Sequence, residues 1–224
     1  MKRILGLTTI VGFIVMFLMV FLWSPIESSM GLVQKIMYVH VPSAWTGYLA
    51  VAVAFIFSIL YLWKRIEQFD VVASCSIEIG AIFCGLALIT GSIWAKPTWN
   101  TFWTWDARLT TTLILFLIIM GYLLLRRFSE YGEKQARISA VIAIIGFLDI
   151  ILVHMSVVWW RTLHQPSTVF SEKPEVINDQ ILTTLIICVS VFSILYAFLL
   201  ISRIELEQKN RLFFKKISAE GELN

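Results

Sequence analysis

The sequence predicts an all-α membrane protein with six spanning helices. Apolar residues make up 58% of the 224 residues and charged residues only 15%, and the mean hydropathy is +0.82. The apolar residues form runs of roughly 20 residues, the length that crosses a hydrocarbon core about 30 Å thick. These runs leave no stretch for a soluble domain, so we expect a single membrane domain over residues 1–224. The predicted spans are Ile4–Trp23, Val41–Trp63, Val71–Trp94, Leu109–Leu125, Ile138–Trp160 and Ile181–Ser202.

The first span begins directly after Lys2 and Arg3, an arrangement that is also typical of a signal peptide. Its apolar run is longer than the usual core of a signal peptide, and no small-residue cleavage pattern follows it. We therefore expect a retained helix, which ends near Pro25 because proline interrupts helices.

Pro42 opens the second span and bears on the position of His40. Proline is tolerated in the first turn of a helix because its missing N–H would have no partner there. It also disfavours the helical conformation at the preceding residue, Val41. We therefore expect His40 at the helix entrance rather than within the helix.

The third and fifth spans contain the carboxylates Glu78 and Asp149. Such groups are costly inside a membrane unless they are paired or face a cavity. The sequence indicates no partner for either, so both stay outside the predicted site. After the sixth span, the charged tail beyond Ser202 is expected to form a short, frayed helix at the membrane surface.

The basic residues predict the orientation of the chain. Thirteen of the 18 Lys and Arg residues fall on one side of the six spans and five on the other. Such an excess marks the cytoplasmic side. We therefore expect both termini on the cytoplasmic side. The loops 24–40, 95–108 and 161–179 are expected on the outer face of the membrane.

The tryptophans are distributed unevenly, since eight of the nine fall at or beyond the outer interface. An ordinary aromatic belt would populate both interfaces. If the densest segment, 99–106, were helical, Trp99, Phe102, Trp103 and Asp106 would share one face. We expect an aromatic platform that suits a large planar ligand, and an aromatic belt is the alternative.

All three histidines are expected toward the outer side of the membrane. Zinc usually needs three or four ligands, and no third ligand is evident beside His40 and His164. Two imidazoles beside an aromatic surface suit haem, whose iron takes axial histidines while its ring stacks on flat side chains. Because His40 and His164 lie at loop or helix ends, we expect a haem that is displayed and handed on. His154 is either a partner of this site or a helix-packing residue.

Three outer cations, Lys96, Arg108 and Arg161, are available to bind the haem propionates. Each also has a simpler alternative role, as an anchor at the interface or as a partner of Asp106. The three cysteines lie inside apolar runs and form no CxxC pair, which favours core packing over a disulfide or a zinc site.

Four segments together resemble the cytochrome c maturation haem protein C family, one of the haem-handling families with a tryptophan-rich "WWD" domain. They are Tyr38-Val39-His40-Val41-Pro42, Gly91-Ser92-Ile93-Trp94-Ala95-Lys96-Pro97, the segment 99–110, and Trp159-Trp160-Arg161-Thr162-Leu163-His164-Gln165. The resemblance covers spans two to five with their outer loops. The chain differs from the family at Asn100, where Gly is frequent, and at Phe102, where Trp is frequent. Asn tolerates a left-handed backbone and Phe can still stack, so both changes are compatible with the family's site.

The resemblance implies that the protein binds haem b transiently at its periplasmic face, with His40 and His164 as the axial ligands. The remaining predicted haem-binding residues are Trp94, Trp99, Phe102, Trp103, Trp105, Asp106, Arg108, Trp159, Trp160 and Arg161. The family presents haem to a membrane-tethered periplasmic haem chaperone for c-type cytochrome assembly. The resemblance also implies two partners, a small single-span membrane subunit and an ATP-binding cassette transporter pair. Nucleic acid is not an expected partner.

The sequence contains no Gly-rich phosphate loop, HExxH or GxSxG motif, so hydrolysis of ATP, peptides or esters is not expected. We therefore expect a haem-presenting scaffold rather than an enzyme with its own ATPase site. The alternatives are a transmembrane haem transporter and a permanent b-type electron carrier.

Overall fold

The computed structural model describes residues 2–164 and 178–221, and these residues form helices joined by loops, with no β-sheet among them. Six helices are long and apolar enough to cross a membrane, which confirms the predicted fold class. The α-helices are α1 (Lys2–Leu18), α2 (Met37–Lys64), α3 (Glu67–Trp99), α4 (Ala107–Phe128), α5 (Glu133–Trp159) and α6 (Asp179–Gly221). The first spanning helix consists of α1 and the π-helical turn η1 (Met19–Trp23) that continues it. Part of the predicted loop 161–179, including Gln165 and Lys173, lies outside the described residues.

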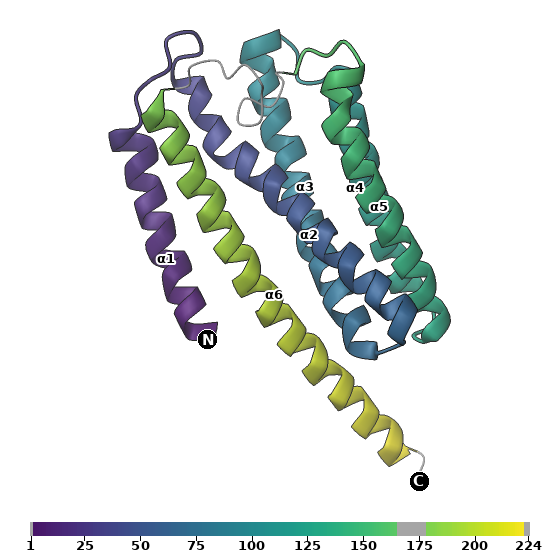
Figure 1. The fold of residues 1–224 in the computed structure, drawn as a ribbon. Helices are drawn as coiled ribbons and strands as arrows, with labels where there is room; N and C mark the ends of the chain where they lie inside the picture. The colour runs from purple at the N-terminus through teal and green to yellow at the C-terminus, as the bar shows by residue number, and fades with distance from the viewer. Residues whose placement is uncertain (1, 165–177, 222–224) are drawn as a thin grey trace.

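The helices α2 and α3 form the centre of the bundle (Figure 1). On one side α4 and α5 pack together, and on the other α1 packs along α6. One buried cluster joins α2 to α5 through side chains such as Val51, Ile77, Leu115 and Ala143. The start of α1 and the end of α6 lie at the same end of the bundle (Figure 1). The connections before α2, between α3 and α4, and after α5 are therefore at the opposite end, and they include the Trp-rich segment and His164.

His40 lies within α2, so the expected position at the helix entrance is wrong. The helix begins at Met37, three residues before His40, and Pro42 is inside it. The reason is packing: Tyr38 is fully buried, and its hydroxyl hydrogen-bonds to Ser24 Oγ at 2.5 Å. The local preference that Pro42 imposes on Val41 is weaker than this burial, so the helix continues through both residues.

The tail beyond Ser202 is also different from the expectation of a short, frayed helix. It continues α6 without interruption to Gly221. Arg203 donates two hydrogen bonds to the carboxylate of Glu78 on α3, at 2.6 and 3.0 Å. Further along, Arg211 bonds to Glu67 at 2.7 Å. These ion pairs hold the extension against α3 and supply the partner that the sequence did not reveal for Glu78.

Asp149 has no such partner among the described residues. It is buried in the middle of α5, and its Oδ2 accepts no hydrogen bond from the described part of the chain. Of the two intramembrane carboxylates, Glu78 is thus paired with an arginine, whereas Asp149 is not paired within the described residues.

Candidate functional site

A cavity of about 660 Å³ lies among the ends of the helices that are remote from the start of α1. This volume is within the range of about 300–1,000 Å³ that is typical of small-molecule and cofactor sites. Its walls are mainly apolar and come from α2, α3, α4, α5 and α6. The aromatic, basic and imidazole side chains that line it are His40, Trp45, Tyr48, Trp94, Trp99, Trp103, Arg108, His154 and His164.

His40 is held in a defined orientation by α3. Its Nδ1 lies 3.0 Å from the carbonyl oxygen of Ala87 and 3.2 Å from Thr90 Oγ1. Because a carbonyl oxygen can only accept, Nδ1 carries the proton and Nε2 keeps its lone pair. The imidazole also packs closely on Gly91, where an added Cβ would lie 2.9 Å from its Cε1. Nε2 is therefore the ring nitrogen whose lone pair is available to accept.

His164 reaches the same cavity from the segment that follows α5. Its backbone N–H donates to Thr162 Oγ1 at 2.8 Å, and its ring lies edge-on to Trp99 at a centroid distance of 6.3 Å. His40 makes a similar edge contact with Trp94, at 5.7 Å. Each of the two imidazoles thus lies beside one of the indoles that line the cavity.

The Trp-rich segment does not form the helical face that the spacing suggested. The helix α3 ends at Trp99, and Asn100 takes a left-handed conformation with φ of 58°, which breaks the helical repeat. Trp99 and Trp103 nevertheless line the cavity together with Trp94. Phe102 and Trp105 do not line it, and their side chains are 59% and 77% exposed.

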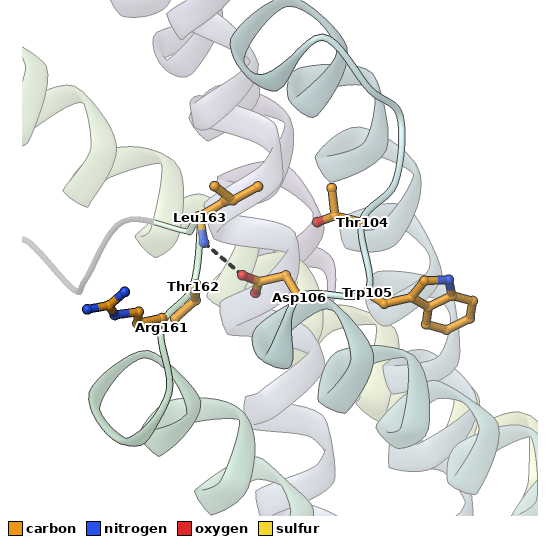
Figure 2. A pocket seen from close by; sticks show the side chains of 6 residues that line it. All are labelled: Thr104, Trp105, Asp106, Arg161, Thr162 and Leu163. Carbon is orange, nitrogen blue, oxygen red and sulfur yellow. Dashed lines mark hydrogen bonds between the residues drawn. The ribbon is translucent and has the colours of Figure 1, made fainter.

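A second, shallower pocket of about 280 Å³ collects several other predicted residues (Figure 2). Its lining residues are Thr104, Trp105, Asp106, Arg161, Thr162 and Leu163. Trp159 and Trp160 line neither pocket, and their rings meet edge to face at 5.8 Å on the exposed surface. These predicted residues are therefore separated from the cavity that contains the imidazoles.

The three candidate cations are in different places. Arg108 lines the larger cavity, whereas Arg161 lines the shallower pocket. Lys96 donates to the carbonyl oxygen of Asn100 at 3.1 Å and lies over the ring of Phe102. Within the described residues none of them forms an ion pair with Asp106, whose carboxylate accepts backbone N–H groups. Arg108 is thus the cation placed to meet an acidic group in the cavity.

The sequence interpretation missed several residues of the cavity wall. Ala44 and Tyr48 follow His40 at helical spacings of four and eight residues, so their shared face could have been recognised. The sequence allows His154 to be a partner of the site or a helix-packing residue, and it lies in the cavity wall. The apolar residues of α6 in the wall could not be recognised in this way, because a membrane-spanning helix has apolar side chains on every face.

The donor set fits haem better than a bare metal ion. Within the described residues, no group of three or more His, Cys, Asp or Glu side chains could hold a metal ion. Two imidazoles with aromatic walls match the axial ligands and flat ring of haem. In addition, the buried Nε1–H of Trp94 finds no hydrogen-bond partner in the described chain, so it is available to an acceptor in the cavity.

Comparison with known proteins shows the family of the chain. Residues 1–217 match the family model described as "Heme exporter protein C". The chain is 38% identical to "Heme exporter protein C" of Bradyrhizobium diazoefficiens over 173 residues, which are 77% of this chain and 66% of that protein. It is 36% identical to the Haemophilus influenzae protein of the same name over 189 residues, 83% of this chain and 75% of that one.

A plant relative is also similar. The chain is 41% identical to the "Putative cytochrome c biosynthesis ccmC-like mitochondrial protein" of Marchantia polymorpha over 146 residues, 65% of this chain and 61% of that one. The matches to the Bradyrhizobium and Marchantia proteins thus cover slightly less than two thirds of those proteins. With nearly its whole length matched by the family model, this chain belongs to the heme exporter protein C family.

Proposed function

We propose that this protein binds haem b in the larger cavity and presents it for the assembly of c-type cytochromes. The observation that carries this proposal is the meeting of His40 and His164 in one cavity walled by Trp94, Trp99 and Trp103. Haem is the cargo here: its iron takes two axial nitrogens, and its ring stacks on indoles. The names of the relatives, which refer to haem export and to cytochrome c biosynthesis, support the same role.

In this proposal, each part of the cavity has its own task. Nε2 of His40 and the imidazole of His164 take the axial positions, and the indoles hold the ring. Arg108 faces the propionates, since a guanidinium forms strong charge-assisted bonds with carboxylates. Transfer requires one axial histidine to leave the iron when the recipient approaches.

We place the cavity on the periplasmic side of the bacterial inner membrane, with a membrane-tethered haem chaperone as the recipient. A small single-span subunit and an ATP-binding cassette transporter pair are the further partners. The excess of basic residues on the side that holds both termini supports this orientation. A transporter would need a continuous polar path, and Glu78 is engaged by Arg203 at 2.6 Å, so this carboxylate gives no support to one.

The test uses the purified full-length protein loaded with haem. We expect a six-coordinate spectrum in the unaltered protein and a loss of one ligand in both His40→Ala and His164→Ala. His154→Ala is the matched control, since it removes a third imidazole of the cavity wall and should leave the iron six-coordinate. If the double variant of His40 and His164 keeps the six-coordinate spectrum and still loads the chaperone, the assignment is wrong.

A permanent electron carrier is distinguished by exchange. A presenter should give up its haem to the haem-free chaperone within the course of an incubation, whereas a permanent carrier should retain it. The absorbance of the separated proteins measures which of them holds the haem.

A further inference from the structure

The carboxylate of Asp106 joins two segments that are far apart in the sequence. Its Oδ1 accepts the backbone N–H of Arg108 at 2.9 Å, which caps the start of α4. Its Oδ2 accepts the backbone N–H of Leu163 at 2.7 Å (Figure 2). The helix cap needs only the first of these bonds. The second bond reaches the residue immediately before His164.

The course of the backbone at residues 162–163 decides where the imidazole of His164 lies. Two consecutive backbone N–H groups are fixed by side chains, that of Leu163 by Asp106 and that of His164 by Thr162. Of these two side chains, only Asp106 belongs to another part of the chain. The Asp106 bond therefore anchors this segment to α4, which itself contributes Arg108 to the cavity.

The location of Asp106 makes a direct contact with haem a poor explanation for this carboxylate. It lines the shallower pocket and not the cavity of the imidazoles. Its two oxygens already accept backbone N–H groups. A carboxylate would also repel the propionates of haem, because like charges at short range disfavour each other.

We propose that Asp106 is a positioning residue, which holds His164 over the cavity by anchoring the backbone of Leu163. The identification of His164 as a ligand rests on the proposed function, but the anchor itself is a property of the protein alone. In Figure 2 the indole of Trp105 and the guanidinium of Arg161 point away from this bond, so neither side chain competes for the carboxylate.

Two substitutions separate the anchor from the helix cap. Serine caps a helix about as well as aspartate, but it has a single short side-chain oxygen and cannot also reach Leu163. Asp106→Ser should therefore keep the start of α4 intact and release Leu163. Asp106→Ala should lose both contacts.

The first measurement is hydrogen exchange of the full-length protein without haem. In both variants we expect the Leu163 amide to exchange about tenfold faster, the effect of losing one bond to a charged acceptor at an accessible site. The first-turn amides of α4 should exchange faster only in Asp106→Ala. Unchanged exchange of Leu163 in Asp106→Ser would overturn the proposal.

The second measurement is the spectrum with haem. Asp106→Ser should reproduce the spectrum of His164→Ala, while His40 remains bound to the iron. If Leu163 is released and His164 still binds as in the unaltered protein, Asp106 is not a positioning residue. If the spectrum of His164→Ala is identical to that of the unaltered protein, His164 is not a ligand and the proposed function is wrong. In that case, faster exchange of the Leu163 amide in Asp106→Ser would still show that Asp106 anchors this segment.

Discussion

The two histidines of the cavity are held by different kinds of structure. His40 is inside α2, packed against Gly91 and bonded to the backbone of α3. His164 is in a connecting segment, and side-chain oxygens hold the backbone there. Connecting segments open at a lower free energy than packed helices do. In the proposed transfer of haem, His164 is therefore the ligand that we expect to leave first.

Gly91 tests whether the packing around His40 matters. An alanine Cβ at this position would lie 2.9 Å from Cε1 and 3.4 Å from Nδ1 of the imidazole, so the ring must move. We expect Gly91→Ala to weaken haem binding about tenfold, because a shift of the ring also strains the bond to Ala87. A haem titration followed by absorbance measures this change.

Gly85→Ala is the matched control on the same helix. Its Cβ would meet only Phe116, at 3.4 Å or more, which is close to ordinary contact. This variant should bind haem as the unaltered protein does. Equal binding by the two glycine variants would show that the close contact with His40 has no part in the site.

The residue types of the site could be predicted from the sequence, but their arrangement in space could be predicted only in part. His40, His164 and the indoles of Trp94, Trp99 and Trp103 do share one cavity. The expected face that also held Phe102 assumed a continuous helix through Asn100. One residue at φ of 58° ends that helix, and side-chain spacing in the sequence does not reveal where such a residue will stop it.

The helices themselves were predictable as spans, but their ends were not. The third span was expected to stop at Trp94, before Lys96 and Pro97, yet α3 continues to Trp99. Pro97 cannot bond to the carbonyl four residues before it, yet the helix continues for two residues beyond it before Asn100 ends it. The extension of α6 depends on contacts with α3 between residues more than a hundred positions apart in the sequence. The hydropathy of a segment does not indicate such contacts.

The pair of Arg203 and Glu78 provides a test of what holds the extension of α6. Removing the guanidinium leaves a carboxylate partly buried without its bidentate partner. We expect Arg203→Ala to lower the free energy of unfolding by about 1 kcal/mol, a value kept small because both side chains are partly exposed. Unfolding of the detergent-solubilised protein by denaturant measures it.

Arg137→Ala serves as the comparison, since Arg137 pairs with Glu133 at 3.8 Å within one helix and at the surface. That variant should change the free energy of unfolding by less than about 0.5 kcal/mol. The haem spectrum should be unaffected in both variants, because neither ion pair lines the cavity. Equal stability of Arg203→Ala and Arg137→Ala would mean that the pair of Arg203 and Glu78 does not help to hold the extension.

The whole molecule has two chemically different ends. Near the start of α3, charged side chains pair across helices, as in the buried bidentate contact of Arg126 with Asp70 at 2.6 and 3.0 Å. At the other end, indoles and imidazoles surround a cavity. Both termini lie at the end with the ion pairs (Figure 1), and the predicted excess of basic residues is on the same side. By the distribution of positive charge, the cavity should therefore open toward the periplasm.

Single cysteines test this orientation directly. Phe102 and Phe128 lie at opposite ends of the bundle, and their side chains are 59% and 83% exposed. The native cysteines Cys75, Cys84 and Cys188 are all buried, so the folded protein should give little background label. We expect a membrane-impermeant maleimide to label Phe102→Cys in cells whose outer membrane has been opened, and to label Phe128→Cys only after the inner membrane is broken. The opposite pattern would put the cavity in the cytoplasm, where a periplasmic recipient could not reach it, and the proposed transfer would then be impossible.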